Sequence, residues 1–507
     1  MGRFLRAAGA PGAWHNLRGG ALASVLLAAA GCAQLAGIDE TSGPDVPSGV
    51  SLSFERISVG ATVVRSPLDI TGQTATYVVA DASAADGLVR VEALQTAPNA
   101  WTASAPALAT GTPTVVFTLP EQPFPRMYAL PSRDVLGAFG AYEHPNPVPP
   151  PSPAMITVTS TLPTPFNGTE AFELYSVGTW TRTTLPAPVL NATTLGPVAF
   201  DYNTVSATGH ARPPERITLA DVHAVLRYRG APLTGVLEVA PFDQTGDDMM
   251  SGVMVAVPLD QTLDVAIAPA TLPTRMMTPQ PAMTSTSMGW LMTAAPGAAA
   301  AFTGGPVLIS GTLTEASPTQ LTATYGNPFV GKGWPAVVEL RAQSSRPYTD
   351  PVTAAGIDLA GSMTSLVAAS TLGAGATLDV PAGVPQTVSL DATPLTTDGL
   401  MIPRPVVAPV ITFTTDGTAD TLYTMVVFQL TPNATATALD RTVVISALGA
   451  EPSFTVPPEL LVPGATYVIR AGAYSGGYPA SATGDLTQRT LPVSQSFYEA
   501  GVFTVIP

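Results

Sequence analysis

The sequence is poor in cysteine, histidine, lysine and charge of either sign. Cys32 is the single cysteine in 507 residues, so no disulfide can form within one chain. Charged residues make up 11% of the chain, against roughly 25% in an average soluble protein, and Lys332 is the only lysine. The formal net charge is −15, and no basic cluster interrupts it. These features exclude a nucleic-acid-binding protein, because such proteins need a basic face.

Long apolar runs are also missing. The apolar run near the start of the chain is only about ten residues long. Arg3, Arg6 and Arg18 precede the apolar run 21–30, which is followed by Gly31 and Cys32. A run of about ten residues is too short for a transmembrane helix, which needs roughly 20. A basic start, a short apolar stretch and small residues are typical of a secretory signal. We therefore expect residues 1–31 to be a signal peptide.

The segment Ala29-Ala30-Gly31-Cys32 resembles the lipobox of bacterial lipoproteins, although Ala29 stands where that family usually has leucine. The resemblance implies a mature protein that begins at Cys32 and carries three acyl chains there, including a diacylglycerol and a palmitate. It also implies a location in the bacterial cell envelope. In this family, an aspartate directly after the cysteine favours retention in the inner membrane. Ala33 stands at that position here, which favours export to the outer membrane. Residues 32–49 are small, acidic and rich in proline, and we expect them to form a flexible tether.

Proline and glycine are abundant, with 52 and 45 residues, and they punctuate short runs of apolar residues. This pattern predicts short strands separated by turns. The expected fold is all-β, with several β-sandwich domains of the immunoglobulin or fibronectin type III kind in series. The expected segments are 50–144, 154–293, 302–395 and 403–507. Residues 145–153 contain six prolines and predict a stiff linker; the alternative is a rigid surface loop within one domain.

The last segment contains Leu461-Val462-Pro463-Gly464-Ala465-Thr466-Tyr467, which resembles the Leu-x-Pro-Gly-x-x-Tyr sequence of fibronectin type III domains. The resemblance implies that Tyr467 opens strand F and that its hydroxyl bonds back across the preceding corner. Residues 410–414 and 422–430 would then be strands A and B. Phe428 would take the place of the tryptophan that this family usually has in strand B.

In residues 221–229, apolar side chains at 222, 224, 226 and 228 alternate with polar ones at 221, 223, 227 and 229, which predicts a half-buried strand. Val222, Ala224 and Leu226 would face the core. His223 would lie on the polar face as a solvated histidine beside Asp221.

Two local clusters are candidate metal sites. Asp243, Asp247 and Asp248 surround a turn glycine and could bind Ca²⁺, although the full EF-hand spacing is missing; a solvated hairpin turn is the alternative. Methionine is concentrated between positions 249 and 292, and thioethers favour Cu(I). The alternative is that these methionines fill an irregular core. The copper candidates are Met249, Met250, Met254, Met276 and Met277.

No catalytic motif is present in the sequence. Ser475 has the spacing of a nucleophile elbow, but no histidine follows it and Gly476-Gly477 prevents the helix that such a site needs. We expect a non-catalytic, lipid-anchored protein that acts as a binding or spacer module, with no cofactor besides the lipid on Cys32. Its partners would be the membrane and an envelope polysaccharide or protein. The alternatives are a glycan-active or calcium-dependent carbohydrate-binding protein, and a copper-binding protein.

Overall fold

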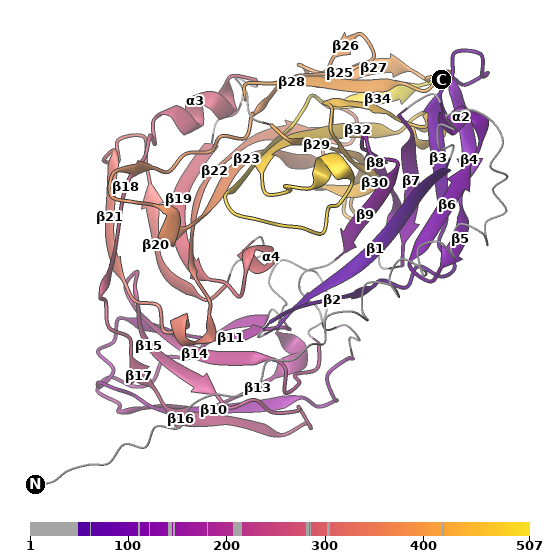
Figure 1. Ribbon diagram of the computed structural model, residues 1–507. Helices are drawn as coiled ribbons and strands as arrows, with labels where there is room; N and C mark the ends of the chain where they lie inside the picture. The colour runs from indigo at the N-terminus through magenta and orange to yellow at the C-terminus, as the bar shows by residue number, and fades with distance from the viewer. Residues whose placement is uncertain are drawn as a thin grey trace, which may run out of the picture. The chain divides into compact units, whose positions relative to one another are not determined.

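The computed structural model describes residues 49–507, except 61, 110–111, 121, 140–143, 145–147, 180, 206–214, 280–282, 284, 302–304 and 418–419. Strands hold 54% of the chain and helices 7%, and several separate sheets pack as β-sandwiches, which confirms the predicted fold class (Figure 1). Residues Ser48–Pro507 form one compact unit. The predicted signal peptide, Cys32 and almost all of the tether lie outside the described residues.

The first sandwich is built from residues 49–139. One layer is the sheet β2-β1-β6-β5, with β9 parallel to β1. The opposite layer consists of β3, β4, β7 and β8, which belong to a longer sheet. Phe54, Trp101 and Phe117 are buried between the layers, and the rings of Phe54 and Phe117 lie 5.0 Å apart. The strands of the first layer are β1 (Gly49–Val59), β2 (Val63–Pro67), β5 (Leu94–Ala97), β6 (Ala100–Ser104) and β9 (Asp134–Phe139).

The second sandwich spans residues 154–256 and has its own core. Its layers are the sheets β13-β10-β16 and β12-β11-β14-β15-β17, with Ile156, Phe172 and Val225 buried between them. The first layer contains β10 (Met155–Thr161), β13 (Thr194–Asp201) and β16 (Asp248–Val253). The second contains β11 (Glu170–Val177), β12 (Thr181–Leu185), β14 (Val222–Arg229), β15 (Leu233–Val239) and β17 (Val255–Ala256).

The proline-rich segment is attached to this sandwich where it is described. The backbone N–H of Arg216 donates to the carbonyl of Val148 at 2.8 Å, and the Asn203 side chain donates to the carbonyl of Pro151 at 3.0 Å. Residues 148–153 are therefore held against the domain, as the surface-loop alternative expected. The stiff linker at 145–153 stays a prediction.

Strand β14 is buried on both faces, which corrects the prediction of a half-buried strand. Val225 faces the core of the second sandwich, whereas Ala224 and Leu226 belong to the core on the other side of the sheet. His223 is consequently fully buried and not solvated. Arg227 is buried on the same side, where Glu170 accepts a hydrogen bond from its guanidinium group at 2.8 Å.

A 14-stranded sheet connects distant parts of the chain. Its strand order is β20-β19-β22-β23-β33-β32-β29-β30-β8-β7-β3-β4. Two further strands extend it at β32: β34 pairs with β32, and β27 pairs with β34. Its strands are β3 (Ala75–Ala80), β4 (Leu88–Glu92), β7 (Thr114–Leu119), β8 (Gln122–Ala129), β19 (Ser285–Ala294), β20 (Val307–Leu313), β22 (Ala336–Thr349), β23 (Gly356–Ala368), β27 (Leu400–Pro403), β29 (Leu422–Pro432), β30 (Leu439–Gly449), β32 (Thr466–Gly476), β33 (Val493–Glu499) and β34 (Phe503–Ile506).

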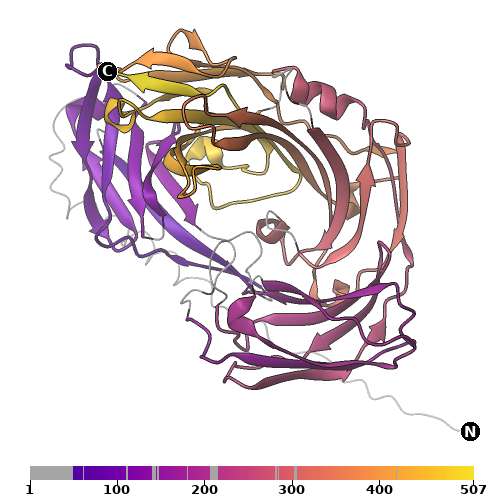
Figure 2. The same cartoon turned by 180° about the vertical axis from the view of Figure 1, so that it is seen from behind.

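The sheet β21-β18-β24 contributes side chains to the same core as β19, β20, β22 and β23. Figure 2 shows the ribbon of the molecule from behind. Its strands are β18 (Gln261–Ala266), β21 (Gln320–Tyr325) and β24 (Ala376–Thr377). The helices are short: α2 (Pro106–Ala109), α3 (Thr271–Met277), α4 (Ala298–Ala301), η1 (Tyr202–Thr204), η2 (Val330–Lys332), η3 (Ala369–Thr371), η4 (Pro458–Leu460) and η5 (Ser481–Thr483). Among the described residues, no helix has the length and hydropathy to cross a membrane.

The C-terminal sandwich begins earlier than the sequence suggests. The sheet β26-β25-β28-β31 packs on β30-β29-β32-β33, and Phe413, Val427 and Ile469 are buried between them. The smaller sheet contains β25 (Pro385–Leu390), β26 (Thr393–Pro394), β28 (Val410–Thr415) and β31 (Ser453–Thr455). Strand β28 pairs with the earlier strand β25 in the smaller sheet, whereas β29 lies in the opposite sheet, so β28 and β29 are not the first two strands of the sandwich. The assignment of 410–414 and 422–430 as strands A and B is therefore wrong.

Tyr467 forms the hydrogen bond that the fibronectin resemblance implies. Its hydroxyl accepts a hydrogen bond from the backbone N–H of Val462 at 2.7 Å, and its ring is fully buried. Phe428, in contrast, belongs to a separate small cluster, where the guanidinium carbon of Arg470 lies 4.9 Å from its ring centre. Phe413 occupies the core of the sandwich instead.

Hydrogen bonding crosses the predicted segment boundaries. Strand β8 of the first segment pairs with β30 of the last, and β23 pairs with β33. Strand β19 also pairs with β22 across the alanine-rich residues 294–301. The residues 145–153 and 294–301 are therefore not breaks in the strand pairing.

We expect deletion of residues 403–507 to destabilise the rest of the protein, because it would expose the edges of β8 and β23. Size-exclusion chromatography and urea unfolding should show aggregation and a lower unfolding midpoint. A chain that begins at Ser48 is the control, because it keeps every described strand pair. A monomeric truncated protein with an unchanged midpoint would contradict this expectation.

Candidate functional site

The structure gives two of the three predicted calcium ligands other partners. Asp243 accepts a hydrogen bond from the backbone N–H of Leu219 at 3.1 Å. Asp248 accepts hydrogen bonds from the backbone N–H groups of Thr245 and Gly246 at 3.0 and 3.1 Å. Asp247 is exposed. Within the described ranges, no group of three His, Cys, Asp or Glu side chains could hold a metal ion, so the geometry favours the hairpin-turn alternative.

The predicted copper ligands are divided among separate parts of the structure. Met250 and Met254 are buried in the second sandwich, whereas Met276 is buried in the core between β18 and β22. Met277 packs against the C-terminal sandwich, and Met249 is 67% exposed. The structure thus separates these thioethers instead of gathering them, and three of the five fill cores.

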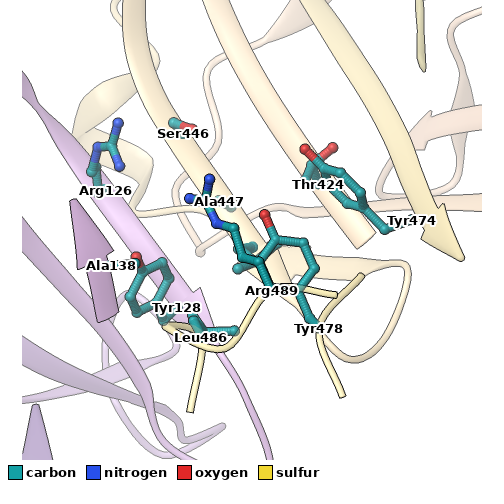
Figure 3. A pocket seen from close by; sticks show the side chains of 11 residues that line it. Arg126, Tyr128, Ala138, Thr424, Ser446, Ala447, Tyr474, Tyr478, Leu486 and Arg489 are labelled. Atoms are coloured by element: carbon teal, nitrogen blue, oxygen red, sulfur yellow. The ribbon is translucent and has the colours of Figure 1, made fainter. Parts of the chain in front are cut away.

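The candidate site is a pocket on one face of the 14-stranded sheet, which we call the Arg–Tyr pocket (Figure 3). Its volume is about 190 Å³. The parallel register of β8 and β30 sets Arg126 opposite Ser446 and Tyr128 opposite Leu448. Side chains two residues apart on a strand share a face, so these four form one surface. The pocket is lined by Arg126, Tyr128, Ala138, Thr424, Ser446, Ala447, Leu448, Tyr474, Tyr478, Leu486 and Arg489.

A loop between β32 and β33 forms the other wall and brings in Tyr478, Leu486 and Arg489 (Figure 3). The loop is fixed to the first sandwich. The backbone N–H of Leu136 on β9 donates to the carbonyl of Gly484, and that of Leu486 donates to Leu136, both at 2.9 Å. These bonds hold the loop that carries Arg489 against β9, a strand more than 300 residues earlier in the chain.

The charged side chains that line the pocket are positive, although the chain as a whole is acidic. Its lining includes two arginines and no carboxylate. The Nε of Arg126 is buried and has no hydrogen-bond partner among the described residues. Burial lowers the pKa of Arg126, because it disfavours the charged guanidinium group. An anion bound in the pocket would stabilise the charged guanidinium group and so oppose this effect of burial.

The pocket also presents phenol side chains beside the two arginines. Burial raises the pKa of Tyr128, and this outweighs the opposing effect of the positive charges on Arg126 and Arg489. The rings of Tyr474 and Tyr478 meet edge to face at 5.5 Å, and the guanidinium carbon of Arg489 lies 5.9 Å from the ring centre of Tyr478. The arrangement can therefore offer charge, hydroxyl groups and aromatic faces to one small ligand.

Sequence reasoning did not identify this pocket. Its residues come from two stretches, 126–138 and 424–489, which only the pairing of β8 with β30 brings together. The alternation of Arg126, Met127 and Tyr128 does indicate a strand with a polar face. No feature of the sequence pairs that strand with β30.

A second pocket, of about 390 Å³, lies near Trp334. Gln261, Tyr325, Asn327 and Ser370 supply its polar groups, and its lining contains no charged side chain. It offers no charge with which to select a ligand.

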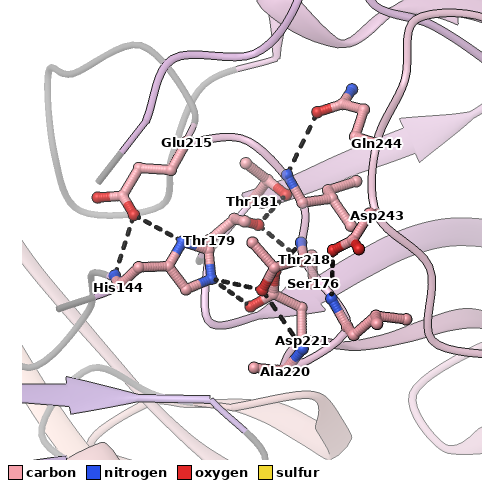
Figure 4. A network of polar contacts seen from close by, with 12 residues as sticks. His144, Ser176, Thr179, Thr181, Glu215, Thr218, Ala220, Asp221, Asp243 and Gln244 are labelled. Carbon is pink, nitrogen blue, oxygen red and sulfur yellow. Dashed lines mark hydrogen bonds and ion pairs between the residues drawn. The ribbon is translucent and has the colours of Figure 1, made fainter. Parts of the chain in front are cut away.

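A polar cluster in the second sandwich surrounds His144 (Figure 4). Glu215 lies 3.0 Å from its Nδ1 and Asp221 lies 2.8 Å from its Nε2, so both ring nitrogens face carboxylates. The backbone N–H of Thr218 donates to the other oxygen of Asp221 at 2.7 Å. Gly178 has a φ of +110°, and a Cβ there would lie 1.8 Å from the Asp221 carboxylate. The cluster thus attaches His144 to the 215–221 loop.

The two histidines of this region have opposite pKa shifts. Burial by itself lowers the pKa of His144, but the hydrogen bonds and charges of Asp221 and Glu215 outweigh it and raise the pKa to about 10. Burial lowers the pKa of His223 to about 4. Neither ring nitrogen of His223 has a hydrogen-bond partner among the described residues. His144 is therefore a cation in the folded protein at neutral pH, and His223 is neutral.

Comparisons with known proteins give little further information. No protein-family model matches the chain, and no curated protein matches it. Among solved structures, a streptococcal ancillary pilin aligns with 58% of this chain and 89% of its own, at 8% sequence identity and a TM-score of 0.11. A likeness at this level carries no argument about fold or function.

We expect the two histidines to limit stability at opposite ends of the pH range. In the unfolded chain both have a pKa near 6.5. His144 contributes its full stabilisation to the free energy of unfolding below pH 6.5, and this stabilisation is lost as the pH rises toward 10. His223 lowers the stability of the protein as the pH falls from 6.5 toward 4, because in this range the unfolded chain binds a proton that the buried histidine does not.

Urea unfolding across pH 4–10 would test this. His144→Gln should destabilise the protein by ~1–3 kcal/mol at pH 6 and by less at pH 10. His223→Leu should reduce the loss of stability between pH 6.5 and 4 and leave the alkaline side unchanged. Parallel pH profiles for both variants and the parent would show that neither histidine controls stability.

Proposed function

We propose that the protein is a lipid-anchored component of a bacterial cell envelope that binds, without catalysis, the anionic group of a ligand in the Arg–Tyr pocket. The observation that carries this proposal is the pair Arg126 and Arg489 in a pocket with no carboxylate in its lining. Guanidinium groups bind carboxylate and phosphate through paired hydrogen bonds. In a chain of net charge −15, such a pocket is a specific local feature and not a consequence of composition.

Anchoring rests on the lipobox resemblance at Cys32. An acylated Cys32 would hold the compact unit at a membrane surface, with residues 32–49 as its tether. Three acyl chains would give stable attachment, since one chain alone binds a membrane only marginally. A polysaccharide or protein of the envelope would then be within reach as the partner.

The lipid anchor predicts that Cys32→Ser blocks signal-peptide cleavage and moves the protein from the membrane to the soluble envelope fraction. Fractionation with a carbonate wash, followed by mass spectrometry of the N-terminus, would measure both effects. Cys32→Ala is a second variant that also removes the thiol. If both variants remain as membrane-bound as the parent, the lipoprotein proposal is wrong.

Anion binding predicts a rise in thermal stability with ligand concentration, because a ligand that binds only the folded state stabilises it. Acetate, phosphate and glucuronate, each compared with chloride at equal ionic strength, are suitable probes for a thermal-shift experiment. Arg126→Gln and Arg489→Gln should lose the shift. The matched control is Arg404→Gln, at an exposed arginine outside the pocket. An equal shift in all four proteins, or in none, would contradict the proposal.

A further inference from the structure

The polar groups of the Arg–Tyr pocket are of two kinds, and an anion needs only one of them. Arg126 and Arg489 supply positive charge, whereas Thr424, Ser446 and the phenols supply neutral hydroxyl groups. The Tyr128 hydroxyl can donate a hydrogen bond as well as accept one. A ligand that uses the whole pocket therefore carries both a negative charge and several hydroxyl groups.

The size of the pocket sets a second condition. Its volume of about 190 Å³ is below the roughly 300–1,000 Å³ of pockets that enclose drug-sized ligands. This space suits one six-membered ring with its substituents. The edge-to-face pair of Tyr474 and Tyr478 adds an apolar surface on which the C–H face of a ring can pack.

We propose that the Arg–Tyr pocket recognises a single carboxylated sugar residue, of the uronic acid type. This inference rests on the proposed function and names the ligand class of the same site. The carboxylate pairs with Arg126 and Arg489, and the ring hydroxyls exchange hydrogen bonds with Thr424, Ser446 and the phenols. Aromatic contact fixes the ring orientation.

A small inorganic anion is the other ligand that two arginines could hold. It would satisfy the guanidinium groups but would leave the hydroxyl groups of Thr424 and Ser446 without a role. The lining residues belong to strands and to the loop before β33, with no helix start to supply the row of backbone N–H groups that phosphate sites often use. The composition of the pocket therefore favours the sugar acid over phosphate.

The test is an equilibrium titration of the full chain with sodium glucuronate, glucose, sodium acetate and inorganic phosphate at constant ionic strength. We expect glucuronate to bind at least about tenfold more tightly than each of the other three, since it alone satisfies both kinds of polar group. Arg489→Lys keeps the charge but loses the planar fork, and should weaken glucuronate binding. Thr424→Val should weaken glucuronate but leave acetate binding unchanged.

The outcomes separate this inference from the proposed function. If acetate or phosphate binds as tightly as glucuronate, the site is an anion site but the sugar-acid inference is wrong. If glucose binds as tightly as glucuronate, the charge has no role and both proposals fail. If none of the four probes binds, both also fail. Arg404→Gln controls for a general change in charge, and circular dichroism of each variant controls for loss of the fold.

Discussion

The pairing of β8 with β30 is the contact on which the rest of the described structure depends. These strands run parallel, with Arg126 opposite Ser446 and Ala129 opposite Gly449, and they join strands that are more than 300 residues apart in sequence. Parallel strands cannot be connected by a tight turn, so this pairing needs a long excursion of the chain. The excursion contains the second sandwich and the strands from β18 to β29.

The Arg–Tyr pocket is a direct product of that pairing. The sheet places residues of β8 and β30 on one surface, and the loop at Leu486 closes over it through its bonds to β9. Each wall of the pocket is thus held by backbone hydrogen bonds. Such a site is preorganised, which reduces the ordering that a ligand must cause when it binds. Its specificity would then come from the geometry of the two arginines and not from a flexible loop.

Local features were predictable from the sequence, and long-range pairing was not. The short apolar runs at 75–80 and 114–119, which are separated by turn residues, predict strands, and β3 and β7 have these bounds. The Tyr467 hydrogen bond follows from a short sequence whose geometry is local. His223 was misjudged because alternation indicates one buried face only when the other face is solvated. In β14 the second face packs on another core, so polar side chains are buried as well. The pocket could not be predicted, since no local pattern specifies the partner of β8.

The central claim is that the joined sheet forms a preorganised site for an acidic group. A crystal structure of residues 48–507 grown with sodium glucuronate would test it most directly. The account predicts the sugar in the Arg–Tyr pocket, its carboxylate within hydrogen-bond distance of Arg126 and Arg489, and little movement of β8 and β30. A structure in which β8 and β30 are not paired, or in which bound glucuronate contacts neither arginine, would contradict it.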